Sequence, residues 1–260
     1  MTSIALKAIL VPASILFATA STTHVYNEDF GKKQKENFQN NYVQSISGFT
    51  FTYVNGTPVK NGSKTSLEKF DSKGNLAEEV FFNRNGETII EFTHTYNDDG
   101  IHLKSLGMVN HKATYNFWAY DYNDSTNTVT KYHTKKNLFK EKWVYKFNKD
   151  GNKTEEEYYD TEGYLLSRKV FKYDEKNRLT ERIEFDAYDN LFGKNIFTYD
   201  SKGNNTKLTE YSADSEILND YTYMYDEKGN LTTRISTDAK GMTNEMTVYL
   251  YEFFPAPTEK

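Results

Sequence analysis

The chain has 260 residues, of which 37% are hydrophobic and 16% aromatic, and its formal net charge is −5. This length allows one large β domain or two small ones, and the wealth of Tyr and Phe favours strands over long helices. A slight acidic excess with interspersed charges argues against nucleic-acid binding, which needs a basic patch. The absence of Cys excludes disulfides and lipid attachment through an N-terminal Cys, so packing and sheet hydrogen bonds must supply the stability.

The first 20 residues have the pattern of a secretory signal peptide. Lys7 precedes an apolar segment that Pro12 interrupts once, and a small-x-small cleavage site ends at Ala20. The segment is too short to span a bilayer, and no other stretch is apolar enough for a membrane span. We therefore expect cleavage after Ala20 and a mature chain that is secreted or periplasmic; an uncleaved anchor is the alternative.

Residues 21–48 are polar and rich in Lys, Asn and Gln, which is typical of an N-terminal arm or cap. This segment is expected to form a short helix or a loose arm that docks through Phe30, Phe38 and Tyr42. The alternation of Phe49 and Phe51 before Asn55-Gly56 predicts an irregular first hairpin that caps the domain. The repeat domain is then expected to occupy 49–254, followed by a frayed tail at 255–260.

An aromatic residue recurs every 25 or 26 residues along most of the chain. In most cases Asp or Asn follows it, and Gly often comes three residues later, as in Tyr225-Asp-Glu-Lys-Gly-Asn230. A weaker turn signal follows about 12 residues after each first one, so the unit reads as one β-hairpin with its link to the next. The aromatic positions are Phe70, Tyr96, Tyr122, Phe147, Tyr173, Tyr199, Tyr225 and Tyr251.

The residues after each aromatic have the chemistry of a tight turn. The Asp or Asn side chain can accept a hydrogen bond from the backbone two residues on, and Gly adopts the left-handed conformation that closes such a hairpin. Asn177 stands where Gly usually stands, because Asn is the next-best residue for a positive φ. The structural turn residues are Asp71, Gly74, Gly100, Gly151, Asp174, Asp200, Gly203, Asp226 and Gly229.

Between the turns, apolar and polar residues alternate. Trp143, Tyr145 and Phe147 share one face of a strand, with Val144 and Lys146 on the other. One apolar face indicates a half-buried antiparallel sheet. About 14 strands fit between the first and last aromatic, and so large a sheet should curl. The predicted fold is all-β: antiparallel β-hairpin repeats with a 26-residue period that form a large curled sheet, a β-solenoid or a barrel-like form.

The recurrent Tyr-Asp-x-x-Gly-Asn resembles the YD repeats of the RHS (rearrangement hotspot) family over about residues 70–251. The chain looks like a small secreted bacterial member. In large members such repeats form a β-sheet shell that encloses a toxin or binds carbohydrate at the cell surface. This chain has no toxin domain or self-cleavage core, and its spacing is longer than the family's usual one. The resemblance implies no catalytic residues.

The sequence holds no recognisable catalytic or metal motif. The five His residues lack metal-ligand spacing; His94 reads as a core or rim residue, and His102 and His111 are a weak candidate pair. The acidic turns, such as Asn148 to Asn152, lack the full pattern of a calcium loop. No GxSxG, phosphate loop or Cys nucleophile occurs. We therefore expect no enzyme activity, no metal and no cofactor.

The remaining candidate for a function is the aromatic surface. Its densest cluster can be a core ladder or a platform for sugar rings. The sequence favours a non-enzymatic scaffold that binds a cell-envelope polysaccharide or a protein partner, without nucleic acid. Two alternatives remain: a protein–protein interaction module (adhesin, inhibitor or immunity factor) and a glycan hydrolase with unidentified carboxylates. The candidate ligand-binding residues are Trp118, Tyr120, Tyr122, Trp143 and Tyr145.

Overall fold

The computed structural model is an almost entirely β structure. It describes residues 31–59, 62–98, 102–109, 112–123, 125–126, 128–135 and 138–255, and it leaves the side chains of 31–35, 112–120, 122, 134–135 and 138–140 undescribed. The predicted signal peptide at 1–20 and the tail from 256 therefore lie outside the described residues. No helix in the described ranges is long and apolar enough to cross a membrane.

Seventeen strands and one short helix are formed by the described residues. They are α2 (Gly31–Asn40), β1 (Val43–Val54), β2 (Thr57–Pro58), β3 (Ser63–Phe70), β4 (Leu76–Phe82), β5 (Thr88–Tyr96), β6 (His102–Val109), β7 (Lys112–Asn123), β8 (Thr128–Lys135), β9 (Leu138–Phe147), β10 (Lys153–Tyr159), β11 (Leu165–Tyr173), β12 (Leu179–Asp186), β13 (Leu191–Tyr199), β14 (Asn205–Ser212), β15 (Ile217–Tyr225), β16 (Leu231–Asp238) and β17 (Thr243–Phe253).

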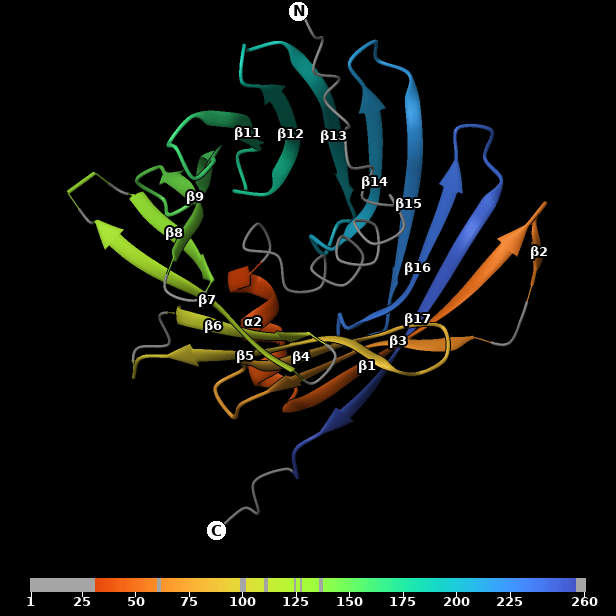
Figure 1. The fold of residues 1–260 in the computed structure, drawn as a ribbon. Helices are drawn as coiled ribbons and strands as arrows, with labels where there is room; N and C mark the ends of the chain where they lie inside the picture. Colours follow the sequence, from red (N-terminus) through yellow and green to blue (C-terminus); the bar gives the residue numbers. More distant parts are fainter. Residues whose placement is uncertain are drawn as a thin grey trace, which may run out of the picture.

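The strands form one large antiparallel sheet that curls around an inner face (Figure 1). From β3 to β17 each strand pairs with its neighbours in the chain, and β1 pairs with both β17 and β3. The strand pairing therefore returns from β17 to β3 through β1. The predicted curled all-β sheet is confirmed. The 14 strands β4 to β17 follow Phe70, in agreement with the roughly 14 expected between the first and last aromatic, and β1, β2 and β3 are formed by the residues up to Phe70.

The turns explain why the chain reverses at regular intervals. At the turn after β3, the Asp71 N–H donates to the carbonyl of Asn75 (2.9 Å), and the Gly74 N–H donates to the carbonyl of Asp71 (3.0 Å). The Asp71 carboxylate also accepts the N–H groups of Lys73 (2.9 Å) and Asn75 (2.8 Å). One side chain thus accepts hydrogen bonds from two backbone N–H groups of the turn, which lie outside the hydrogen-bonded strands.

The same backbone pattern recurs after β11, β13 and β15, where Asp174, Asp200 and Asp226 open the turn. Among the predicted Gly positions, Gly74, Gly151, Gly203 and Gly229 have φ between 73° and 82°, and Asn177 has φ 58°. Gly100 lies outside the described residues. The opposite end of the sheet has turns of the same kind, opened by Asn83, Asp160, Asp186, Ser212 and Asp238.

The tyrosines before the turns also have a hydrogen-bonding role that the sequence pattern did not reveal. Tyr199 ends β13, and its hydroxyl donates to the carbonyl of Leu179, the first residue of β12, at 2.7 Å. Each such hydroxyl whose side chain the structure describes donates to a carbonyl 20 residues earlier, and each acceptor begins a strand. The bonds are Tyr96 to Leu76, Tyr173 to Lys153, Tyr199 to Leu179, Tyr225 to Asn205 and Tyr251 to Leu231.

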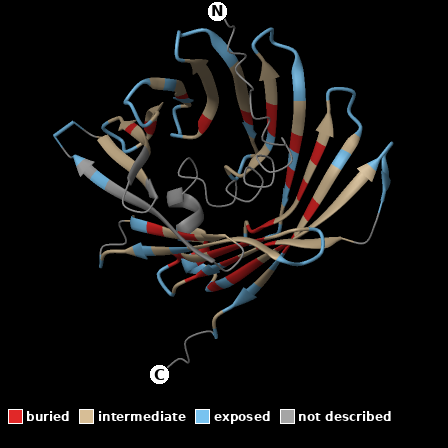
Figure 2. Ribbon diagram, in the orientation of Figure 1, coloured by how far each residue is buried: buried red, intermediate tan, exposed pale blue. Residues whose placement is uncertain are grey.

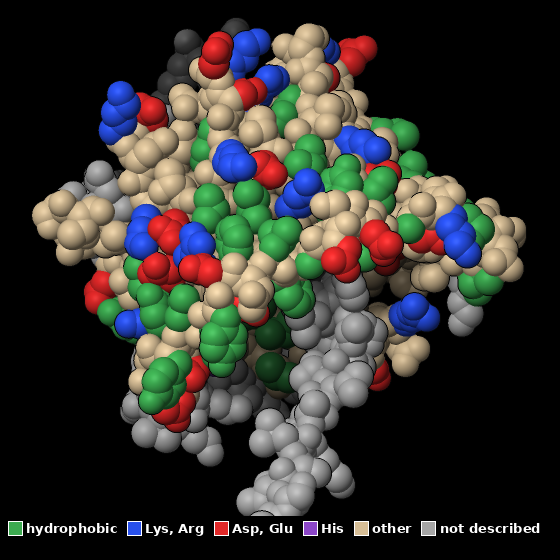
Figure 3. Space-filling view, turned by 90° about the horizontal axis from the view of Figure 1, so that it is seen from above, with side chains coloured by type: hydrophobic (Ala, Val, Ile, Leu, Met, Phe, Trp, Pro, Cys, Tyr) green, Lys and Arg blue, Asp and Glu red, His purple; other side chains and the backbone are tan. Residues whose placement is uncertain are grey.

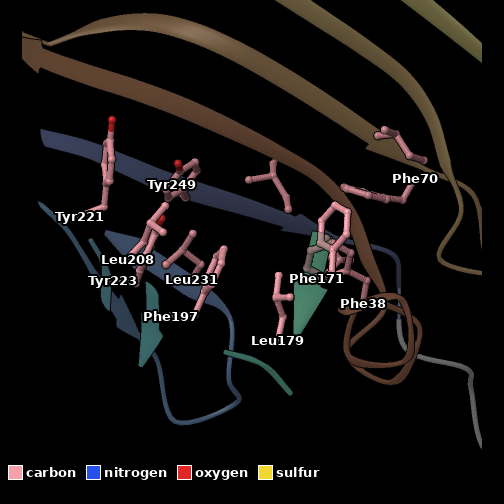
Figure 4. Close-up of a cluster of buried hydrophobic side chains, with 13 residues drawn as sticks. Phe38, Phe70, Phe171, Leu179, Phe197, Leu208, Tyr221, Tyr223, Leu231 and Tyr249 are labelled. Carbon is pink, nitrogen blue, oxygen red and sulfur yellow. The ribbon is translucent and has the colours of Figure 1, made fainter. Parts of the chain in front are cut away.

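The hydrophobic core lies on the inner face, towards the end of the sheet where these tyrosines sit (Figures 2 and 4). Helix α2 lies within the curl and contributes Phe38, which is 1% exposed and whose ring centroid is 4.8 Å from that of Phe70. Asn37 of the same helix donates to the side chain of Asn230 (3.1 Å). Part of the expected N-terminal arm is therefore a docked helix, whereas Tyr42 is 45% exposed and β1 already begins at Val43.

Tyr199→Phe is expected to lower the free energy of unfolding by about 1 kcal/mol, because it leaves the buried carbonyl of Leu179 without its donor. Urea unfolding followed by circular dichroism measures this. Tyr164→Phe is the matched control, since Tyr164 is 71% exposed and should unfold as the parent does. Equal stability of the two variants would contradict a structural role for the hydroxyl.

Candidate aromatic binding face

Strand register brings the five predicted aromatic positions to one face of the sheet. Tyr120 of β7 lies opposite Lys131 of β8, which lies opposite Trp143 of β9. Directly opposite residues in antiparallel strands share a face, and the other predicted positions follow the same alternation. The side chains of Trp118, Tyr120 and Tyr122 lie outside the described part of the structure.

Trp143 and Tyr145 have different surroundings. Tyr145 is 5% exposed, and the Nζ of Lys153 lies over its ring and over that of Phe171 in the core. Tyr145 is therefore a packing residue. Trp143 is only half-buried, and its ring stacks on that of Tyr158 from β10, with centroids 4.9 Å apart and planes 17° apart.

Polar side chains hold the Trp143–Tyr158 pair in place. The Tyr158 hydroxyl donates to Glu141, and the other oxygen of Glu141 bonds His133 Nδ1 at 2.9 Å. Burial and this bond to Glu141 raise the pKa of Tyr158, so its hydroxyl stays protonated as the donor. The Nζ of Lys131 lies 5.4 Å from the centroid of Trp143. The result is a rigid aromatic pair bordered by a carboxylate, an imidazole and an ammonium group.

An ionic group lies beside this pair. Glu156 of β10 bonds Lys153 (3.1 Å) and Lys169 (3.3 Å). Burial alone would raise the pKa of Glu156, but the two ammonium groups lower it to about 2. The Lys153 side chain is only 5% exposed, so its charge depends on this carboxylate. The inner face therefore combines flat apolar surface with fixed charges and hydrogen-bonding groups. We call the surface formed by Lys131, His133, Glu141, Trp143, Glu156 and Tyr158 the aromatic–polar face.

A second polar cluster was missed by the sequence analysis. His94 Nε2 lies 3.1 Å from Glu79 Oε2, and His94 Nδ1 lies 2.8 Å from Ser105 Oγ. His102 Nε2 is 3.0 Å from the same Ser105 oxygen. Alternation correctly suggested an inward His94, but its partners come from β4 and β6, and only strand register reveals them. His111 lies outside the described residues.

Glu68 of β3 lies opposite Glu79 and is 2% exposed. Burial, followed by the charge of Glu79, raises the pKa of Glu68 well above its ordinary range, which favours the protonated form of its carboxyl group. No group of three or more His, Asp or Glu side chains arranged to hold a metal occurs among the residues that the structure describes.

No protein-family model matches the chain, and no curated protein sequence is similar to it. Solved structures show distant similarity. A porin-like protein from Bacteroides uniformis has 13% identity and a TM-score of 0.38, with 81% of this chain and 98% of that chain covered. The TcdB2-TccC3-Cdc42 structure has 11% identity and a TM-score of 0.25, with coverage of 78% and 15%. A DUF1329 family protein from Desulfovibrio piger has 9% identity and a TM-score of 0.30, with coverage of 83% and 87%.

Glu156→Gln is expected to lower the free energy of unfolding at pH 7 by about 3 kcal/mol, because it removes the carboxylate charge that bonds both Lys169 and the buried Lys153. A carboxyl whose folded pKa is depressed stabilises the protein above its unfolded pKa, and this stabilisation is lost as pH falls. The difference between the variant and the parent should therefore shrink as the pH falls from about 5 towards 2. Urea titrations across this pH range measure it.

Glu181→Gln is the control, because its partner Lys172 has a side chain that is 56% exposed. An exposed pair contributes less than about 1 kcal/mol. Similar losses for the two variants, or a Glu156→Gln difference that does not change with pH, would show that Glu156 does not balance the charge of Lys153.

Proposed function

We propose that the protein is a secreted or periplasmic scaffold whose aromatic–polar face binds a cell-envelope glycan. The observation that carries this proposal is the stacked pair Trp143 and Tyr158, half-buried on the inner face and locked by Glu141. Binding sites for small organic groups combine apolar and aromatic surface with a few fixed polar groups. A sugar ring offers one C–H face and an edge of hydroxyls, which matches that combination.

The rigidity of the site favours binding. Tyr158 and Trp143 come from adjacent paired strands, and Glu141 and His133 extend the same network across β8 and β9. Side chains fixed before the ligand arrives lose little conformational freedom on binding. The resemblance of the turn sequences to YD repeats also supports this proposal, because large members of that family bind carbohydrate.

A second candidate function is a protein-interaction module, favoured by exposed apolar side chains at the turns of one end of the sheet. Tyr164, Tyr188 and Phe192 are 71%, 86% and 70% exposed. Apolar side chains of this size on a surface often mark contacts with another protein. Figure 3 shows hydrophobic side chains among acidic and basic ones on one outer side of the molecule.

Cosedimentation with purified peptidoglycan and a panel of insoluble polysaccharides tests the glycan proposal. Trp143→Ala and Tyr158→Ala should each weaken binding by about 3- to 10-fold, the range expected for losing one aromatic stacking contact. Binding should change little with added salt, because stacking is not an ionic attraction. Circular dichroism checks that each variant is folded.

Tyr188→Ala is the matched control, since it removes an exposed aromatic side chain far from the aromatic–polar face in the strand order. It should bind as the parent does. Binding that is lost in Tyr188→Ala and kept in Trp143→Ala would overturn the aromatic–polar face as the site and would assign glycan binding to the exposed aromatic side chains near the turns. The absence of binding to every polysaccharide would overturn the glycan proposal.

A further inference from the structure

The cluster around Ser105 has the connectivity of a nucleophile, a base and an orienting acid. Ser105 Oγ is 2.8 Å from His94 Nδ1, and His94 Nε2 is 3.1 Å from Glu79 Oε2. A hydroxyl bonded to an imidazole that a carboxylate holds in turn is the arrangement that activates serine for acyl transfer. The three residues come from adjacent strands β4, β5 and β6, so the sheet itself fixes their spacing.

The hydrogen-bond partners determine where the protons lie. His102 Nε2 is 3.1 Å from the carbonyl of Lys104, which can only accept, so this nitrogen carries a proton. It therefore also donates to Ser105 Oγ, and the single Ser105 proton points to His94 Nδ1. The proton of His94 is then on Nε2 and faces Glu79. This assignment leaves Ser105 ready to transfer its proton to His94.

The hydrogen-bonded group around Ser105 is buried. Ser105 is 5% exposed and Glu79 is 8% exposed. Burial and the nearby His94 lower the pKa of His102 to about 4, so at neutral pH it remains an uncharged N–H donor. A donor fixed beside the reacting oxygen can stabilise the negative charge that develops on a carbonyl oxygen during attack.

Ser105 lies on the same face of the sheet as the aromatic–polar face. It is opposite Trp118 of β7, which is opposite His133 of β8. Two strand spacings separate Ser105 from His133, which is roughly 10 Å between backbones. Trp143 on β9 and Tyr158 on β10 lie three and four strand spacings from Ser105, roughly 14 and 19 Å across the sheet, so a glycan of several sugar rings spans from that pair to Ser105.

We propose that Ser105 is the nucleophile of an esterase that removes acyl groups from an O-acylated glycan; this inference rests on the proposed glycan-binding function. His94 is the general base, Glu79 orients it, and the His102 N–H serves the oxyanion. An acyl ester on a sugar hydroxyl of the same glycan, some rings away from the ring that the aromatic pair holds, presents a neutral carbonyl to Ser105.

The reaction balances without a cofactor. Ser105 Oγ bonds the ester carbonyl carbon while its proton moves to His94 Nδ1. The bond from that carbon to the sugar oxygen then breaks, and the sugar oxygen takes the proton from His94. Water next attacks the acyl-serine, gives one proton to His94, and releases the carboxylic acid. His94 returns the proton to Ser105, so one ester and one water yield one hydroxyl and one acid.

The test uses the full chain with a fluorophosphonate probe, 4-nitrophenyl acetate and an O-acetylated polysaccharide. Mass spectrometry of the labelled protein should place the probe on Ser105, without any variant that risks misfolding. Ser105→Ala and His94→Gln should lower 4-nitrophenyl acetate hydrolysis by about 100-fold or more. Ser66→Ala is the matched control, because Ser66 is also buried, at 3% exposure, and should react as the parent does.

Cosedimentation of the same preparation with the O-acetylated polysaccharide separates the two proposals. Labelling of Ser105 together with acetate release from that polysaccharide supports the esterase. Glycan binding without labelling or acetate release overturns the esterase and leaves the binding proposal intact. Labelling of Ser105 without acetate release from any bound glycan overturns the proposed substrate class. Labelling of Ser105 without glycan binding overturns the glycan-binding function on which the esterase proposal rests.

Discussion

The pairing of β1 with both β17 and β3 is the constraint on which the rest of the structure depends. The chain lays down β3 to β17 as successive hairpins, and local turn chemistry is sufficient for each of those steps. Among the described strands, β1 makes the pairing that is most distant in sequence, since its register matches Ser47 with Leu250 on one side, while Leu67 lies opposite Ser47 on the other. By using both of its edges, β1 covers the outer edges of β3 and β17, which would otherwise be open to pairing with other chains.

That arrangement divides the inner face into a packed end and a polar region. At the packed end, Phe38 of α2 meets the core side chains, and the tyrosine hydroxyls join neighbouring strands. Farther around the curl, β4 to β6 and β8 to β10 carry polar and aromatic inner side chains that bond one another across strands, as His94 does with Glu79 and His133 with Glu141. Buried polar networks cost stability when they are incomplete, and proteins retain such costs mainly at functional sites.

The sequence predicted the local features well, because their causes are local. Asn177 was assigned a positive φ from its place in the repeat, and the structure gives 58°. Alternation also placed Trp143 and Tyr145 on one face, but it did not distinguish the core residue Tyr145 from the half-buried Trp143. The meeting of His94, Glu79 and Ser105 depends on the register of three strands, which no motif encodes. One signal for the tyrosine hydrogen bonds was available in the sequence. Six of the eight recurrent aromatics are Tyr rather than Phe, which indicates that their hydroxyl groups form hydrogen bonds.

The most direct measurement of the central claim is disulfide trapping of β1 against both of its partners. The chain has no Cys, so no native thiol competes with the engineered pairs for disulfide formation. Ser47→Cys with Leu250→Cys, and Ser47→Cys with Leu67→Cys, place each pair directly across an antiparallel ladder, within the distance that a disulfide spans. We expect both double variants to form intramolecular cross-links in high yield under mild oxidation, whereas Ser47→Cys with Met224→Cys should not. A cross-link on one side of β1 only would show that β1 does not join the two ends of the sheet. That result would contradict the arrangement that forms the inner face.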